Sequence, residues 1–198
     1  VTLTANLALI TGEIASEAKI DVEGIVRKTI CDVGYNNSDV SYDGNKITLI
    51  NALKQQSPEI SKAVVKSDGT FGAGDQGMMF GYACREFMPN YMPLAHQLAF
   101  GLIKHHERLR REEKNILYPD AKSQVTLHYE NGEPQFIDTI LLSTQHYPGL
   151  SLASLREWAL PHIKHAVERM DADNVAQGGK SLLAKHGFDK TRVLINPA

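Results

Sequence analysis

The sequence of 198 residues predicts an α+β protein of mainly antiparallel sheets with helices packed on one face. Some segments alternate apolar and polar residues with the period of a strand, and others repeat apolar residues with the period of a one-sided helix. An Asn131-Gly132 pair also separates two alternating segments, which is typical of an antiparallel hairpin. Strands followed by helices and hairpins favour sheets that helices cover on one side.

The first part of the chain predicts a strand, a helix and a second strand. Residues 1–10 alternate, and their apolar members on one face are Val1, Leu3, Ala5, Leu7 and Leu9. A helix is expected to begin after Asp21, a good N-cap, and to end at Gly34, where a left-handed C-cap residue belongs. The turn at residues 43–45 then leads into a strand over residues 46–53.

A polar segment follows this second strand. The residues Gln55-Gln56-Ser57-Pro58-Glu59-Ile60 end the strand and open a polar loop to about residue 71. This loop is long enough to act as a lid. A glycine-rich turn comes next, and the apolar run Met78–Ala83 predicts another strand.

The second half predicts two helices, a hairpin and a last strand. One helix is expected to start at Pro93, because proline is favoured in the first helical turn. Residues 123–129 and 136–144 are the two predicted strands of the hairpin. A helical stripe over residues 152–170 and a short strand over residues 192–195 complete the pattern.

Composition excludes several classes of partner. The formal net charge of -2 argues against a nucleic-acid or anionic-membrane partner, since such partners favour a basic face. No apolar run has the length of a transmembrane helix, and no signal-peptide pattern opens the sequence. Cys31 and Cys84 are interpreted as reduced, buried residues of a cytoplasmic protein.

Three clusters of polar residues favour structural roles. His162 and His165 have a spacing that could hold a metal, but no third ligand stands out, so solvated histidines are expected. His105 and His106 lie among interleaved acidic and basic residues, which predicts a solvated helix face with ion pairs. Residues 178–181 are similar to the end of a phosphate-binding loop, but no strand precedes them, so a flexible loop is expected.

Two other motifs could form a site. The glycine-rich segment from Gly72 to Ala83 contains Asp75, and glycines let a ligand approach the main chain closely. A tight turn before a strand is the alternative. Asp120 and Lys122 lie two residues apart at a strand entrance, so their side chains share one face and could meet a ribose hydroxyl and a phosphate oxygen. An exposed ion pair is the alternative for this second motif.

The segment Gly72-Ala73-Gly74-Asp75-Gln76-Gly77-Met78-Met79-Phe80-Gly81-Tyr82-Ala83 resembles the signature of the S-adenosylmethionine synthetase family. Further resemblances run in family order along nearly the whole chain. They comprise Ile10-Thr11-Gly12-Glu13, Gln55–Ile60, Pro119–Val125, Leu141–His146 and Leu194–Pro197, of which the last two are expected to be structural. The resemblance implies the synthetase fold over part of the first domain and the middle domain.

This resemblance implies a reaction, its substrates and the residues that bind them. Methionine sulfur would attack the ribose 5′ carbon of ATP, and the released triphosphate would be hydrolysed. Catalytic roles are implied for Lys122 and Asp75. Methionine binding is implied for Glu13, Gln56 and Asp75, and ATP binding for Asp120, Ala121 and Lys122. The family also implies Mg²⁺ and K⁺, and a homodimer or dimer of dimers.

Departures from the family set the expected domain organisation. Residues 1–71 correspond to the latter part of the N-terminal domain, with a mobile loop near 56–71, and residues 72–198 to the middle domain. The family's His-Pro-Asp-Lys segment and its C-terminal domain have no match in this sequence. Most of the expected metal ligands belong to these unmatched parts. An incomplete portion of the enzyme is therefore expected. A noncatalytic oligomerising partner of a full-length synthetase and a small-ligand-binding module are the alternatives.

Overall fold

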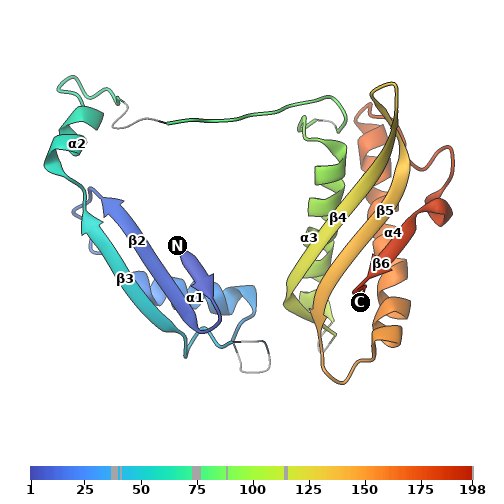
Figure 1. Cartoon of the computed structure of the whole chain (residues 1–198), viewed down its shortest axis with the longest axis horizontal. Coiled ribbons are helices and arrows are strands. Elements are labelled where there is room, and N and C mark those ends of the chain that lie inside the picture. The colour runs from blue at the N-terminus through green and yellow to red at the C-terminus, as the bar shows by residue number, and fades with distance from the viewer. Residues whose placement is uncertain (37–39, 41, 73–76, 88, 114–115, 198) are drawn as a thin grey trace. The chain divides into compact units, whose positions relative to one another are not determined.

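The computed structural model describes residues 1–36, 40, 42–72, 77–87, 89–113 and 116–197. The chain divides into two compact units, Val1–Phe80 and Gly81–Ala198. Within the described residues, each unit combines helices with a three-stranded sheet (Figure 1). The predicted α+β class is confirmed.

The sheet of the first unit has the order β1-β2-β3. β1 (Thr2–Thr4) runs antiparallel to β2 (Leu7–Ile14), and β2 runs parallel to β3 (Thr48–Gln55). The parallel pairing requires a crossover between β2 and β3, which α1 (Val22–Val33) provides. α1 packs on one face of the sheet, around the buried residues Ala8, Ile30 and Ile47 (Figure 1).

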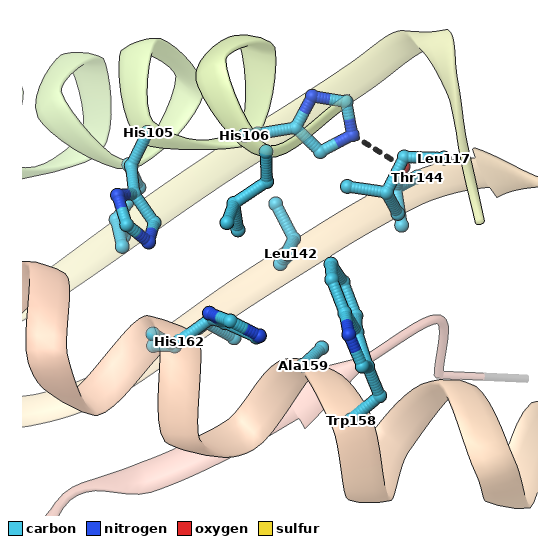
Figure 2. A pocket seen from close by; sticks show the side chains of 11 residues that line it. His105, His106, Leu117, Leu142, Thr144, Trp158, Ala159 and His162 are labelled. Carbon is cyan, nitrogen blue, oxygen red and sulfur yellow. Dashed lines mark hydrogen bonds between the residues drawn. The ribbon is translucent and has the colours of Figure 1, made fainter. Parts of the chain in front are cut away.

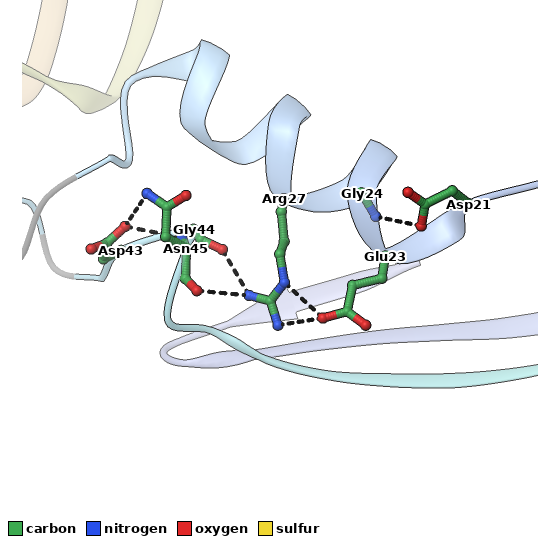
Figure 3. Close-up of polar contacts among 7 residues, drawn as sticks. All are labelled: Asp21, Glu23, Gly24, Arg27, Asp43, Gly44 and Asn45. Carbon is green, nitrogen blue, oxygen red and sulfur yellow. Dashed lines mark hydrogen bonds and ion pairs between the residues drawn. The ribbon is translucent and has the colours of Figure 1, made fainter.

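Local hydrogen bonds fix α1 at both ends, as its sequence predicts. The Asp21 carboxylate accepts a hydrogen bond from the Gly24 backbone N–H at 2.9 Å (Figure 3). Gly34 closes the helix in the left-handed region with φ 118. Between these ends, the Arg27 guanidinium donates to the Gly44 carbonyl at 3.0 Å and thereby ties the helix to the turn before β3.

The first predicted strand is interrupted. Ala5 has a positive φ of 43 and forms a turn with Asn6, so the segment becomes the β1–β2 hairpin. Beyond this turn the core face consists of Ala8 and Ile10, at 1% and 5% exposure, and Leu7 and Leu9 are only partly buried. The single face that alternation predicts over residues 1–10 is therefore not kept in β2, because a turn inside an alternating segment changes which residues face the helix.

Two further segments differ from their predictions. The polar loop contains a short helix, α2 (Pro58–Val64), with the proline at its first position. The predicted strand Met78–Ala83 is not formed, and Met79 and Phe80 are 94% and 90% exposed. An apolar run becomes a strand only where a neighbouring strand supplies hydrogen bonds, and the described residues provide no such neighbour for this segment.

The second unit is built on a long hairpin. β4 (Leu117–Glu130) and β5 (Glu133–His146) pair antiparallel around Asn131 and Gly132, which have positive φ of 53 and 79. This geometry is the one that the Asn-Gly pair predicts. The last strand, β6 (Arg192–Ile195), runs parallel to β5.

Two long helices cover one face of this sheet. α3 (Leu94–Glu112) and α4 (Leu152–Ala176) lie side by side behind β4, β5 and β6 (Figure 1). Their shared core includes Leu98, Ile140, Leu155 and Val167, each at most 1% exposed. A 3-10 turn, η1 (Phe188–Lys190), precedes β6. Across the described residues, no helix is both long and apolar enough to cross a bilayer.

Candidate functional site

Asp120 and Lys122 lie on the face of the hairpin away from α3. Lys122 pairs with Ser143 and Ala121 with Thr144 in the β4–β5 register. Successive side chains of a strand point to opposite faces, so Asp120 and Lys122 share one face and Ala121 takes the other. Both charged side chains are exposed.

These two residues line an open pocket of about 350 Å³. The pocket combines one acid, one cation, hydroxyls and amides from β4, β5 and the end of β6. Its lining residues are Asp120, Lys122, Ser143, Thr144, Gln145, Asn196 and Pro197. Such a mixed polar lining suits a ligand that carries hydroxyls and negative charge.

The wall of this pocket continues into the helical layer. Thr144 is 6% exposed, and its Oγ1 lies 2.7 Å from Nε2 of His106 on α3 (Figure 2). The Thr144 hydroxyl also lies 3.1 Å from the Gln145 carbonyl, so it has partners in both the helical layer and the sheet. His106 is therefore part of the structure beneath the pocket.

His105 and His106 line a small apolar cavity of about 20 Å³ between α3 and α4 (Figure 2). Each is 5% exposed, so the expectation of a solvated helix face was wrong for these two residues, although ion pairs such as Glu107–Arg111 do cover the outer face. Burial lowers the pKa of both histidines to about 4 and keeps them neutral near pH 7. Alternation of charged residues did not reveal which two side chains face the core.

Glu13 and Gln56 lie at one edge of the other sheet. β2 and β3 are parallel, so their carboxyl ends meet, and Glu13 pairs in register with Lys54. The Gln56 backbone N–H donates to the Ile14 carbonyl at 3.0 Å and extends this ladder. The exposed Glu13 side chain and the half-buried Gln56 are thus near neighbours within the first unit.

Asp75 lies outside the described residues, together with the rest of the glycine turn at 73–76. Glu13 and Gln56 belong to the first unit, and Asp120 and Lys122 belong to the second. The pocket of Asp120 and Lys122 and the strand ends at Glu13 and Gln56 are therefore two separate candidate sites, one in each unit.

The 178–181 segment, which was expected to be a flexible loop, is held by hydrogen bonds to α4. Asp171 accepts hydrogen bonds from the Ser181 hydroxyl at 2.6 Å and the Leu182 backbone N–H at 2.7 Å, so the 178–181 loop is fastened to α4. No group of three or more described His, Cys, Asp or Glu residues could hold a metal ion, His162 and His165 included. Cys31 and Cys84 are free thiols and are only partly buried.

Comparison with known proteins decides the family. The sequence profile for the central domain of S-adenosylmethionine synthetase matches residues 70–198, and the profile for its N-terminal domain matches residues 1–58. The chain belongs to the S-adenosylmethionine synthetase family. It is similar to the S-adenosylmethionine synthase of Helicobacter pylori (strain HPAG1), with 41% identity over 172 residues. That alignment covers 84% of this chain and 43% of the relative, so the chain spans less than half of the relative's length.

Sequence reasoning placed Asp120 and Lys122 together but did not include the residues opposite them. Ser143, Gln145 and Asn196 belong to segments that were expected to be structural, and the structure places them in the lining of this pocket. A hairpin register counted outward from Asn131-Gly132 places Leu141 opposite Lys122, and two irregularities in the β4–β5 pairing shift the partner to Ser143. Asn196 could not be found in this way, because its partner Thr144 lies 52 residues earlier.

Proposed function

We propose that this chain contributes to S-adenosylmethionine synthesis from L-methionine and ATP. The observation that carries the proposal is that Asp120 and Lys122 line the same open pocket in a chain of the synthetase family. We further propose that residues 1–71 are the latter part of the N-terminal domain, with a mobile loop near 56–71, and that 72–198 are the middle domain. A cytoplasmic location and a homodimer or dimer of dimers belong to the same proposal.

The proposed reaction is a displacement at carbon. A lone pair of the methionine sulfur forms a bond to the ribose 5′ carbon as the bond from that carbon to the triphosphate oxygen breaks. The electron pair leaves with triphosphate, and the sulfur becomes a positively charged sulfonium. Such a step needs positioned reactants and stabilised charge more than proton transfer.

The pocket residues suit the ATP side of this reaction. Lys122 would place its ammonium beside the oxygens of the leaving triphosphate, where negative charge grows as the bond breaks. Asp120, on the same face, would accept hydrogen bonds from the ribose hydroxyls. Ala121 would contribute backbone only, because its side chain takes the opposite face.

The methionine side would use residues from the first unit. The carboxylates of Glu13 and Asp75 would hold the methionine ammonium, and the Gln56 amide would donate to its carboxylate. These roles are those of this chain's own side chains, and no role is assigned to Mg²⁺ or K⁺ within them. Both ions remain part of the proposal only as requirements of the whole enzyme.

Substitution of Lys122 tests the proposal. In a full-length synthetase containing these residues, Lys122→Met should lower kcat by about a hundredfold or more, since a group that stabilises transition-state charge is removed. The methionine KM should change by less than about twofold, because that substrate binds elsewhere. The control is Lys185→Met, which changes another exposed lysine outside the pocket and should keep normal kinetics. Normal turnover of Lys122→Met, or an equal loss in both parameters, would refute the proposed role.

A further inference from the structure

Asn196 occupies an unusual place at the end of β6. Its φ of 41 lies in the left-handed region, which asparagine tolerates better than most residues. The backbone N–H of Asn196 donates to the Leu142 carbonyl at 2.9 Å, so the chain is still paired with β5 at this point. It then turns away from the sheet toward Pro197, at the rim of the pocket.

The Asn196 side chain takes the place that the backbone of a longer β6 would have beside β5. Its Oδ1 accepts from the Thr144 backbone N–H at 2.7 Å, and its Nδ2 donates to the Thr144 carbonyl at 2.9 Å. One carboxamide thus makes both backbone hydrogen bonds to Thr144, which a continued parallel strand would make through two different residues. It extends the pairing of β5 beyond Leu142, where the β6 register ends.

Asn196 is itself held from the helical layer. Arg156 on α4 donates through Nε to the Ile195 carbonyl at 2.9 Å and through Nη2 to the Asn196 carbonyl at 3.0 Å. The backbone on both sides of the carboxamide is therefore anchored. The two hydrogen bonds from the Asn196 carboxamide to Thr144 are called the clamp below. Because the backbone of Asn196 is anchored, the clamp can hold β5 in one place.

The clamped residue is the one beside the pocket's charged pair. Thr144 is the register partner of Ala121, which stands between Asp120 and Lys122. The Thr144 hydroxyl is fixed on its other side by His106. Three contacts, to the Thr144 N–H, carbonyl and hydroxyl, thereby determine where this part of the hairpin lies.

We propose that Asn196 is a positioning residue that sets the place of Lys122 through Thr144. This inference rests on the proposed role of Lys122 in the synthetase reaction. The role needs asparagine, since aspartate lacks the donor for the Thr144 carbonyl and glycine accepts the φ but lacks the carboxamide. A shift of the lysine ammonium relative to the leaving phosphate would slow the reaction without weakening methionine binding.

The kinetic test is a double-mutant cycle in a full-length synthetase containing these residues. Asn196→Gly should lower kcat by roughly tenfold to a hundredfold and leave the methionine KM within about twofold. In a Lys122→Met background, Asn196→Gly should lower kcat little further, because its effect acts through the lysine that this background lacks. Asn131→Gly is the matched control, as it removes an asparagine side chain at positive φ in the hairpin turn.

A second measurement tests the contact between Asn196 and Thr144 and does not depend on enzyme activity. Hydrogen exchange of the Thr144 amide, followed by NMR in the 198-residue chain, should accelerate at least about tenfold in Asn196→Gly and stay unchanged in Asn131→Gly. Asn196→Asp, which keeps the acceptor for this N–H, should exchange more slowly than the glycine variant. This variant also serves if the glycine variant does not fold.

The outcomes separate the two proposals. If Lys122→Met is slow but Asn196→Gly is normal or fully additive with it, positioning by Asn196 is overturned and the role of Lys122 stands. If Lys122→Met turns over normally, the proposed role of Lys122 fails and positioning fails with it, whatever the Thr144 exchange rate. A slow but non-additive Asn196→Gly with faster Thr144 exchange supports both.

Discussion

His105 and His106 are held neutral by their position on α3. Burial is the largest influence on each pKa, and neighbouring cations add to it. The charged or titratable groups that act on His105 are Arg108, Arg169, His162 and His165, and those that act on His106 are Arg110 and Glu107. Protonation of either histidine would place a buried charge between the helices and the sheet. Acidic pH therefore favours the unfolded chain, in which the imidazolium is solvated.

The free energy of unfolding should therefore fall as pH decreases from about 6.5 toward 4. Between these pH values the two histidines are protonated in the unfolded chain but neutral in the folded chain. Above this range their contribution to stability is fully present. His106→Gln should flatten the slope by on the order of 1 kcal/mol per pH unit. Urea unfolding at a series of pH values measures this. His96→Gln, an exposed histidine on the same helix, is the control and should leave the slope unchanged.

Asp75 remains a prediction at the level of a single residue. If its carboxylate holds the methionine ammonium, Asp75→Asn in a full-length synthetase should keep the melting temperature and lose most catalytic efficiency. If it only organises the glycine turn, asparagine should replace it well, because both residues favour turns for the same reason. Thermal melting beside steady-state kinetics distinguishes the two, and near-normal kinetics would remove Asp75 from the site.

At the scale of elements, the turn before β3 meets α1 at very close range. Gly44 is buried, and a Cβ on it would lie 2.8 Å from Ile30 Cγ2 and 3.1 Å from Ile30 Cβ. The second of these atoms is next to the helix backbone and cannot rotate away. The glycine is therefore needed for packing.

Gly44→Ala should destabilise the first unit by about 1 to 3 kcal/mol, the usual cost of overpacking a filled core. Gly81→Ala is the control, since its Cβ would meet nothing within 4 Å. Chemical denaturation of the two variants and the parent chain gives the comparison. Equal stability of all three would show that α1 moves to make room.

Elements whose signals are local were predictable from sequence. The Asp21 cap, the Gly34 left-handed residue and the Asn131-Gly132 turn each act through neighbouring residues, and all three appear as expected. The Ala5 turn and the unpaired Met78–Ala83 segment were missed, because strand formation depends on partners that alternation does not specify.

The candidate site divides in the same way. Asp120 and Lys122 could be placed on one face because strand alternation is local. The clamp from Asn196 to Thr144 and the contact from His106 to Thr144 join residues 52 and 38 positions apart, so only tertiary structure reveals them. Arg156, which anchors Asn196, was hidden for the same reason.

For the whole molecule, the two units differ in the size of their cores. The main buried cluster of the first unit consists of Ala8, Ile30 and Ile47. The second unit buries both long helices against three strands, in one continuous cluster. A small unit that buries little apolar surface is marginal by itself, because the entropy of ordering the chain is not offset.

Residues 81–198 expressed alone should therefore unfold in one cooperative thermal transition, and residues 1–80 alone should be largely unfolded. Circular dichroism melting and the dispersion of amide NMR signals measure both. Cooperative melting of the 1–80 fragment at the temperature of the larger fragment would contradict this expectation.

The parallel pairing of β6 with β5 has a consequence for how the protein is made. The β4–β5 hairpin can close as soon as it leaves the ribosome, but β6 emerges only after α4 and the segment that follows it. At typical rates of about 5 to 20 residues per second, the outer edge of β5 then waits for seconds with unpaired backbone groups. An open strand edge is a site for wrong pairing and for chaperones during that interval. Once β6 has emerged, the hydrogen bonds of Arg156 and Asn196 hold its end beside β5 and so keep this strand edge covered.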